Sequence, residues 1–149
     1  MALSKLSSLY MAVVADHSKH PHHQGTLDGV EAVLLNNPTC GDVISLSVKF
    51  DGDVIEDIAF SGDGCTISTA SASMMTDAVI GKTKAEALEL ARAFSDLVSG
   101  CQNPKQKDLG EAELLEGVSK FPQRIKCSTL SWHALEKAIE RSQEGSDEE

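Results

Sequence analysis

The sequence is poor in aromatic and basic residues, and each shortage excludes a class of protein. Aromatic residues make up 4% of the 149 positions, so the core must consist mainly of Leu, Ile, Val and Ala. Lys and Arg number 13 against 23 Asp and Glu, a net charge of -10. Nucleic acids and anionic membranes bind basic surfaces, so neither is expected as a partner. An acidic chain suits a protein partner with a basic surface.

Targeting and membrane segments are also absent from the sequence. No run approaches the roughly 20 apolar residues that span a bilayer, and no basic start followed by an apolar stretch marks a secretory signal. The expected location is the cytoplasm. In that reducing compartment, the four cysteines are more typical of metal ligands or reactive thiols than of disulfides.

Hydrophobic periodicity predicts a single α+β domain over residues 1–142, followed by an acidic, disordered tail at 143–149. Apolar residues alternate over 44–50, and Asp51-Gly52 is typical of a hairpin turn. The alternation breaks near Ile55 and Glu56, which indicates a bulge. Thr83 and Glu86 form a capping box at the start of a helix that Gly100 ends. The expected elements are a helix at 3–14, strands at 30–35, 44–50 and 54–60, and helices at 66–79, between Thr83 and Gly100, and from about Ser128. We therefore expect a small antiparallel three-stranded sheet with helices packed on one face.

Two further segments are expected to be irregular. The histidine-rich stretch from His17 to His23 contains Pro21 and is predicted to be a loop. Its histidines could bind a metal, but a solvated loop is the preferred interpretation because no fixed geometry is imposed. Residues 101–119 are polar and are expected to hold one short helical piece, with Cys101 as a nonessential thiol.

Three cysteines lie at predicted element boundaries. Cys40 precedes a strand, whereas Cys65 and Cys127 are expected directly before helices, whose positive ends stabilise a thiolate. Asp42 lies two residues after Cys40, so the two side chains point the same way in an extended segment. Three thiolates and a carboxylate form a tetrahedral set that Zn²⁺ accepts, and Arg124 or Lys126 could balance its negative charge.

Spacing alone does not show that these residues meet. Each cysteine taken singly is as well explained as a small buried apolar residue. Asp42 alone is more typical of a turn or surface carboxylate, and Arg124 alone of a solvated charge.

Three ordered motifs carry a resemblance to a known family. They are Asn37-Pro38-x-Cys40-Gly41-Asp42, Gly62-x-Gly64-Cys65-x-Ile67-Ser68-x-Ala70-Ser71 and Arg124-x-Lys126-Cys127-Ser128-x-Leu130. Together they resemble the IscU-type iron–sulfur cluster assembly family over nearly the whole chain. The resemblance implies that Cys40, Asp42, Cys65 and Cys127 cluster at one end of the fold. It also implies a cysteine desulfurase as partner and downstream iron–sulfur assembly proteins as acceptors.

Two features favour the SufU branch of that family. Scaffold members usually have a histidine directly before the third cysteine, where this chain has Lys126. This chain also has extra residues relative to those members, roughly the segment 101–119. The branch implies a zinc-bound sulfur carrier, active as a sulfurtransferase only with a SufS-like desulfurase. Cys40 would accept the persulfide sulfur, and Arg124 would balance the charge. The alternative is a scaffold that binds iron or a transient [2Fe–2S] cluster at the same residues.

Overall fold

The computed structural model describes residues 2–27, 29–30, 32–37, 41–101, 103–120 and 122–148. Side chains are described for a smaller set, which leaves out those of residues 2–10, 37, 111, 114, 116–120, 122–124 and 142–148. Within the described part of the chain, no helix combines the length and the apolar character that a bilayer span requires.

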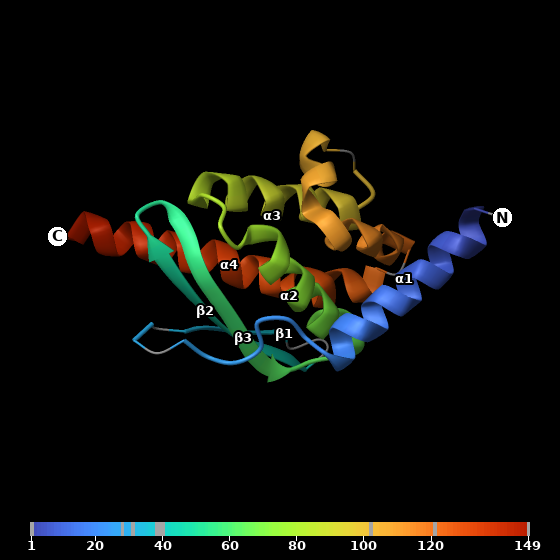
Figure 1. Ribbon diagram of the computed structural model, residues 1–149, viewed down its shortest axis with the longest axis horizontal. Coiled ribbons are helices and arrows are strands. Elements are labelled where there is room, and N and C mark those ends of the chain that lie inside the picture. The colour runs from blue at the N-terminus through green and yellow to red at the C-terminus, as the bar shows by residue number, and fades with distance from the viewer. Residues whose placement is uncertain are drawn as a thin grey trace.

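The elements follow the predicted order of helix, strands and then helices (Figure 1). This arrangement confirms the predicted α+β fold. The elements are α1 (Ala2–Lys19), β1 (Val33–Asn37), β2 (Asp42–Asp51), β3 (Val54–Asp63), α2 (Thr66–Val79), α3 (Lys84–Val98), the 3₁₀ segment η1 (Pro104–Lys120) and α4 (Pro122–Glu148).

The sheet is antiparallel, with the order β1-β2-β3. Ile44, Leu46 and Val48 of β2 are buried, as their alternation predicts. The predicted bulge is present: Lys49 pairs with Asp57 and Phe50 with Ile55. Glu56 is therefore the extra residue of β3, and the bulge restores the inward direction of Ile55.

The helices cover one face of the sheet in two layers. Helices α2 and α4 contact the strands, and α3 and η1 pack against α2 and α4; Figure 1 shows α3 on the far side of α2 and α4 from the sheet. The rings of Phe94 and Trp132 stack with centroids 4.6 Å apart. The Trp132 indole N–H donates to Ser71 Oγ over 3.2 Å, which satisfies the polar atom of a side chain that is 1% exposed.

Two helix boundaries differ from the prediction. Helix α1 continues to Lys19, so His17 is helical rather than part of a loop. Helix α4 begins at Pro122, earlier than the predicted start near Ser128. Proline fits the first turn of a helix because its missing N–H is not needed there. Cys127 consequently lies within the helix rather than before it.

The segment expected to be a polar insert also contributes to the core. The 3₁₀ segment η1 kinks at Gly110 and buries Leu109, Ala112 and Leu115. At the other end of α4, the helix runs through Glu148. The division into a domain at 1–142 and a disordered tail at 143–149 stays a prediction.

Gly62 allows the end of β3 to approach the start of β2. A Cβ atom at this position would lie 2.1 Å from the Val43 backbone oxygen, and its φ is 135°. Both observations exclude an L side chain without movement of backbone. Gly62 directly precedes the turn to Cys65, so its close approach to Val43 also determines where α2 begins.

We expect Gly62→Ala to lower the free energy of unfolding by about 3 kcal/mol or more, because steric overlap adds to the strained dihedral. The matched control is Gly52→Ala in the hairpin turn. Gly52 also has a positive φ but has open space around its Cα, so only the dihedral penalty of about 1 kcal/mol remains. Urea unfolding measures both variants; equal losses would contradict the packing argument.

Candidate metal centre

Cys65 occupies the N-cap of α2. Its Sγ accepts a hydrogen bond from the Ser68 N–H over 3.4 Å, as N-cap side chains do. Gly64 leaves room for this arrangement: a Cβ there would lie 2.9 Å from Ser68 Oγ. The glycine-rich turn therefore delivers a thiol to the positive end of a helix, where an anionic sulfur is stabilised.

Asp42 is the first residue of β2, and it is 3% exposed. Its Oδ1 accepts a hydrogen bond from the Cys65 N–H over 3.0 Å. Its Oδ2 lies 3.8 Å from Cys65 Sγ. Among the described residues, no basic side chain forms an ion pair with Asp42. A buried carboxylate beside a thiol needs a cation, and a metal ion would supply one.

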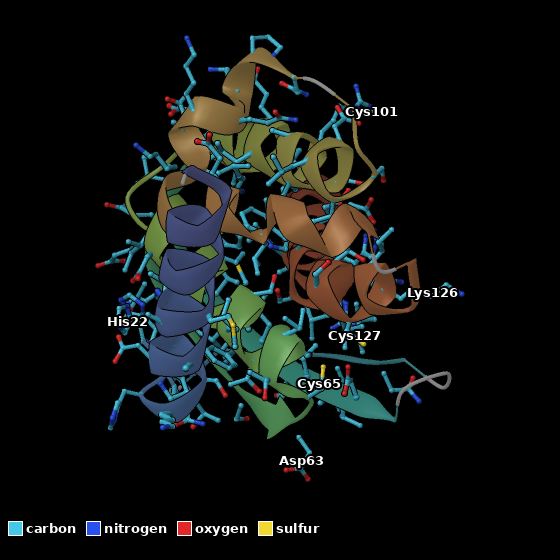
Figure 2. The ribbon with its side chains drawn as sticks, turned by 90° about the vertical axis from the view of Figure 1, so that its right-hand side faces the viewer. His22, Asp63, Cys65, Cys101, Lys126 and Cys127 are labelled. Carbon is cyan, nitrogen blue, oxygen red and sulfur yellow. The ribbon has the colours of Figure 1, made fainter. Side chains whose placement is uncertain are left out.

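Cys127 brings the third donor from α4, which packs against α2. It is 1% exposed. The donor atoms of Asp42, Cys65 and Cys127 all lie within 4.8 Å of one another, and Figure 2 shows the sulfurs of Cys65 and Cys127 close together. Tetrahedral Zn²⁺ places its donors about 3.3–3.8 Å apart. The residues present therefore fit a metal ion after small inward shifts.

The structure brings together three of the four predicted metal ligands, although their binding of a metal stays a prediction. Cys40, the fourth, lies outside the described residues, and so does the side chain of Arg124. Lys126 is exposed and points outward in Figure 2. Cys101 is exposed and does not belong to the donor group.

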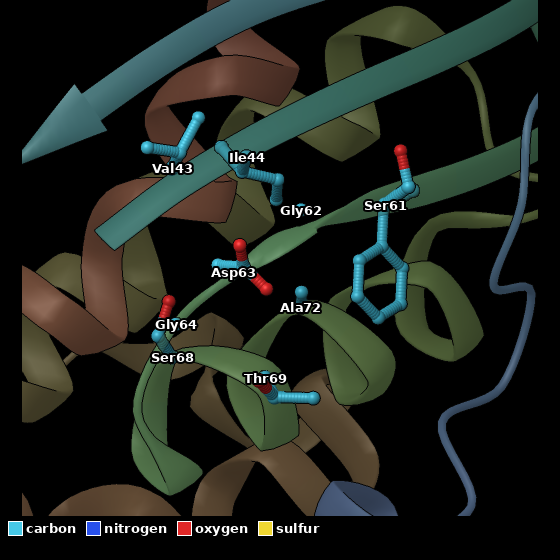
Figure 3. Close-up of a pocket in the computed structure, with 10 residues that line it drawn as sticks. Val43, Ile44, Ser61, Gly62, Asp63, Gly64, Ser68, Thr69 and Ala72 are labelled. Atoms are coloured by element: carbon cyan, nitrogen blue, oxygen red, sulfur yellow. The ribbon is translucent and has the colours of Figure 1, made fainter. Parts of the chain in front are cut away.

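A small open pocket lies beside this group, at the start of β2, the end of β3 and the start of α2 (Figure 3). Gly64 and Ser68 line it together with Ile44 and Phe60. The enclosed part of the pocket has room for about one water molecule, and the rest opens to solvent. No described cysteine lines this pocket, so the sulfur donors lie beside it rather than in it.

Sequence reasoning missed a second group of donor atoms. His17, His22 and Asp77 place their donor atoms within 4.8 Å of one another. The histidine-rich segment was visible in the sequence, but it was interpreted as a solvated loop. Asp77 carries no local motif, because it meets the histidines only through the packing of α1 on α2.

The fold is a small α+β domain with a three-stranded antiparallel sheet and helices on one face. The largely buried group of cysteine and aspartate donors at one end suits this domain to metal binding. The chain belongs to the NifU-like N terminal domain family, whose model matches residues 9–128.

Named relatives carry two different descriptions. The chain is 78% identical over 142 residues to "Iron-sulfur cluster assembly scaffold protein IscU" of Streptococcus pyogenes serotype M1, covering 95% of this chain and 89% of that protein. It is 51% identical to "Zinc-dependent sulfurtransferase SufU" of Bacillus subtilis, covering 95% of this chain and 97% of that protein. A crystal structure of a putative iron-sulfur cluster assembly scaffold protein for the SUF system, from Fervidobacterium islandicum, superimposes with a TM-score of 0.81 at 36% identity, covering 85% of this chain and 93% of that one. The predicted resemblance to the IscU and SufU proteins is therefore confirmed.

Removal of one sulfur donor should weaken zinc binding sharply. If Cys65 and Cys127 are direct ligands, we expect Cys65→Ala and Cys127→Ala each to lower Zn²⁺ affinity by more than the roughly 10–100-fold that loss of an outer partner costs. Competition with a chromogenic chelator measures the affinity. Cys101→Ser is the matched control, since this exposed cysteine lies outside the donor group, and it should bind zinc like the parent protein. Unchanged affinity in Cys127→Ala would exclude this residue as a ligand.

Proposed function

We propose that this protein is a zinc-binding sulfur acceptor in iron–sulfur cluster assembly, with a SufS-like cysteine desulfurase as its sulfur donor and further assembly proteins downstream. The observation that carries the proposal is the convergence of Asp42, Cys65 and Cys127 within 4.8 Å. No described histidine joins this donor group. Cys40, two residues before Asp42 in the sequence, would complete a set of three sulfurs and one oxygen. Such a set suits Zn²⁺.

The described residues would hold the ion from three separate elements. Cys65 at the N-cap of α2 and Cys127 within α4 supply sulfur from two packed helices. The Cys65 N–H fixes the Asp42 carboxylate. Bound Zn²⁺ would keep the cysteines as thiolates without redox chemistry of its own. These three residues would remain as ligands while Cys40 reacts.

Sulfur transfer would follow the chemistry of thiol–disulfide exchange. The Cys40 thiolate attacks the outer sulfur of the desulfurase persulfide. A bond forms between Cys40 Sγ and that sulfur, the bond from that sulfur to the desulfurase cysteine breaks, and the desulfurase thiolate leaves with the electron pair. No external oxidant or reductant is needed. Arg124, three residues before Cys127, would balance the charge of the site, and the net charge of -10 favours a partner with a basic docking surface.

The second candidate is a scaffold for a [2Fe–2S] cluster. The observation that favours it is the 78% identity to a relative named as a scaffold protein. Iron and sulfide would then occupy the same residues. Against it, Lys126 holds the position of the usual scaffold histidine and is exposed, so it contributes no ligand.

Metal analysis separates these two functions. We expect untagged protein, purified without oxygen, to be colourless and to contain about one zinc per chain that a strong chelator removes slowly, as a closed four-ligand site predicts. Elemental analysis and visible absorption are the measurements. Iron with acid-labile sulfide and a brown colour would instead establish the scaffold function.

Sulfur transfer should depend on one cysteine outside the described residues. With a desulfurase and free cysteine, we expect the parent protein to gain a persulfide on Cys40, which mass spectrometry of the intact and digested protein detects. Cys40→Ser should lose this modification, because a hydroxyl does not attack the persulfide at neutral pH. Cys101→Ser should keep it. If the Cys40→Ser variant gains as much persulfide as the parent protein, Cys40 is not the sulfur acceptor.

A further inference from the structure

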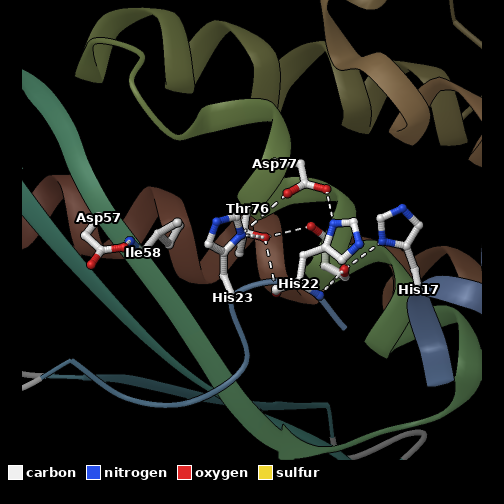
Figure 4. Close-up of polar contacts among 8 residues, drawn as sticks. His17, His22, His23, Asp57, Ile58, Thr76 and Asp77 are labelled. Carbon is white, nitrogen blue, oxygen red and sulfur yellow. Dashed lines mark hydrogen bonds and ion pairs between the residues drawn. The ribbon is translucent and has the colours of Figure 1, made fainter. Parts of the chain in front are cut away.

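The second donor group lies at the contact between the end of α1 and the C-terminal half of α2. His17 is in the last turn of α1 and is 1% exposed. His22 follows α1, and its side chain is 43% exposed; Asp77 is on α2, with a side chain that is 37% exposed. Their donor atoms lie within 4.8 Å of one another, and Figure 4 shows the two imidazoles and the carboxylate converging. One donor is therefore rigid and two can adjust.

Ser73 on α2 holds both histidines in this position. Its Oγ lies 2.6 Å from His17 Nδ1 and accepts a hydrogen bond from the His22 N–H over 2.7 Å. The imidazole rings of His17 and His22 have their centroids 4.6 Å apart. A hydrogen bond that fixes the orientation of a ring is the usual outer contact of a metal-bound histidine.

The backbone after His22 supports the same arrangement. His23 has a φ of 58°, in the left-handed region that few residues other than glycine adopt. Its Nδ1 lies 3.5 Å from Asp77 Oδ1 and 3.0 Å from Thr76 Oγ1. The chain thus turns sharply so that two consecutive histidines face one carboxylate. Strained backbone of this kind persists where surrounding contacts hold it in place.

We propose that His17, His22 and Asp77 form a second metal site, which binds a divalent transition-metal ion such as Zn²⁺ or Fe²⁺ through two imidazoles and one carboxylate. Two nitrogens and one oxygen suit these ions and leave coordination positions open. Mg²⁺ and Ca²⁺ prefer sets of oxygen ligands. Bonds of about 2.1 Å require tetrahedral donors about 3.4 Å apart. His22 Nδ1 and Asp77 Oδ2 are closer than this, so the two atoms must separate and exchange their contact for bonds to the ion.

Helix geometry makes this site independent of the cysteine group. Cys65 precedes α2 and Asp77 lies near its end. At 1.5 Å per residue, the two positions are about 18 Å apart along the helix, and Figure 2 shows His22 well away from Cys65 and Cys127. No ion can contact both groups.

Cobalt titration of untagged, full-length protein already loaded with about one equivalent of Zn²⁺ tests the proposal. We expect added Co²⁺ to produce visible d–d absorption without the near-ultraviolet charge-transfer bands of thiolate ligation. His22→Ala and Asp77→Asn should each weaken this binding by at least about 10-fold, because each removes a ligand. Both side chains are partly exposed, so the fold should persist, and circular dichroism checks this.

His20→Ala is the matched control, because His20 is an exposed histidine of the same segment that lies outside the donor group. It should bind Co²⁺ like the parent protein. Absence of Co²⁺ binding, equal affinity in all three variants, or absorption with thiolate charge-transfer bands would each overturn the proposal. With either of the first two outcomes, the histidine group would only hold α1 against α2. With the third outcome, the cobalt would occupy the cysteine group.

Discussion

The hydrogen bond from the Cys65 amide to the Asp42 carboxylate joins the first residue of β2 to the start of α2. It involves a charged acceptor and lies at the positive end of a helix, and both features stabilise a buried anion. Gly62 and Gly64 allow the approach, because a Cβ at either position would overlap with neighbouring atoms. The contact holds the Asp42 carboxylate beside the half-buried thiol of Cys65, and the buried thiol of Cys127 lies close to both. A cation shared by such a group would stabilise it, so metal binding there would be coupled to local folding at this end of the molecule.

Elements with strong local patterns could be predicted from the sequence. The alternation of Ile44, Leu46 and Val48 predicted β2, and Thr83 with Glu86 predicted the start of α3, where the Glu86 N–H donates to Thr83 Oγ1. The bulge was predictable too, since Glu56 interrupts an alternation that extends over the rest of β3. In each case, the signal and the structure involve residues close together in the chain.

Features that depend on contacts between distant segments were not predictable in the same way. His17 was assigned to a solvated loop, but its ring is buried against Ser73, 56 residues later in the chain. Cys127 was placed before a helix because local signals did not reveal the start at Pro122. The convergence of Asp42, Cys65 and Cys127 came from family resemblance, not from spacing, because β2, α2 and α4 meet only through tertiary packing. The parts assigned to Cys40 and Arg124 stay predictions.

The two donor groups differ in chemistry as well as in position. Thiolates are soft ligands that favour zinc and iron–sulfur clusters, whereas imidazoles with a carboxylate accept a wider range of divalent ions. Their separation of about 18 Å along α2 exceeds the Debye length of about 8 Å at physiological ionic strength. Salt screens only solvent-exposed charges effectively, and both groups include buried side chains, so an ion at the histidine group would be incompletely screened from the cysteine group. Helix α2 is the direct structural connection between the two groups, since it carries Cys65 at its N-cap and Ser73 and Asp77 in its second half.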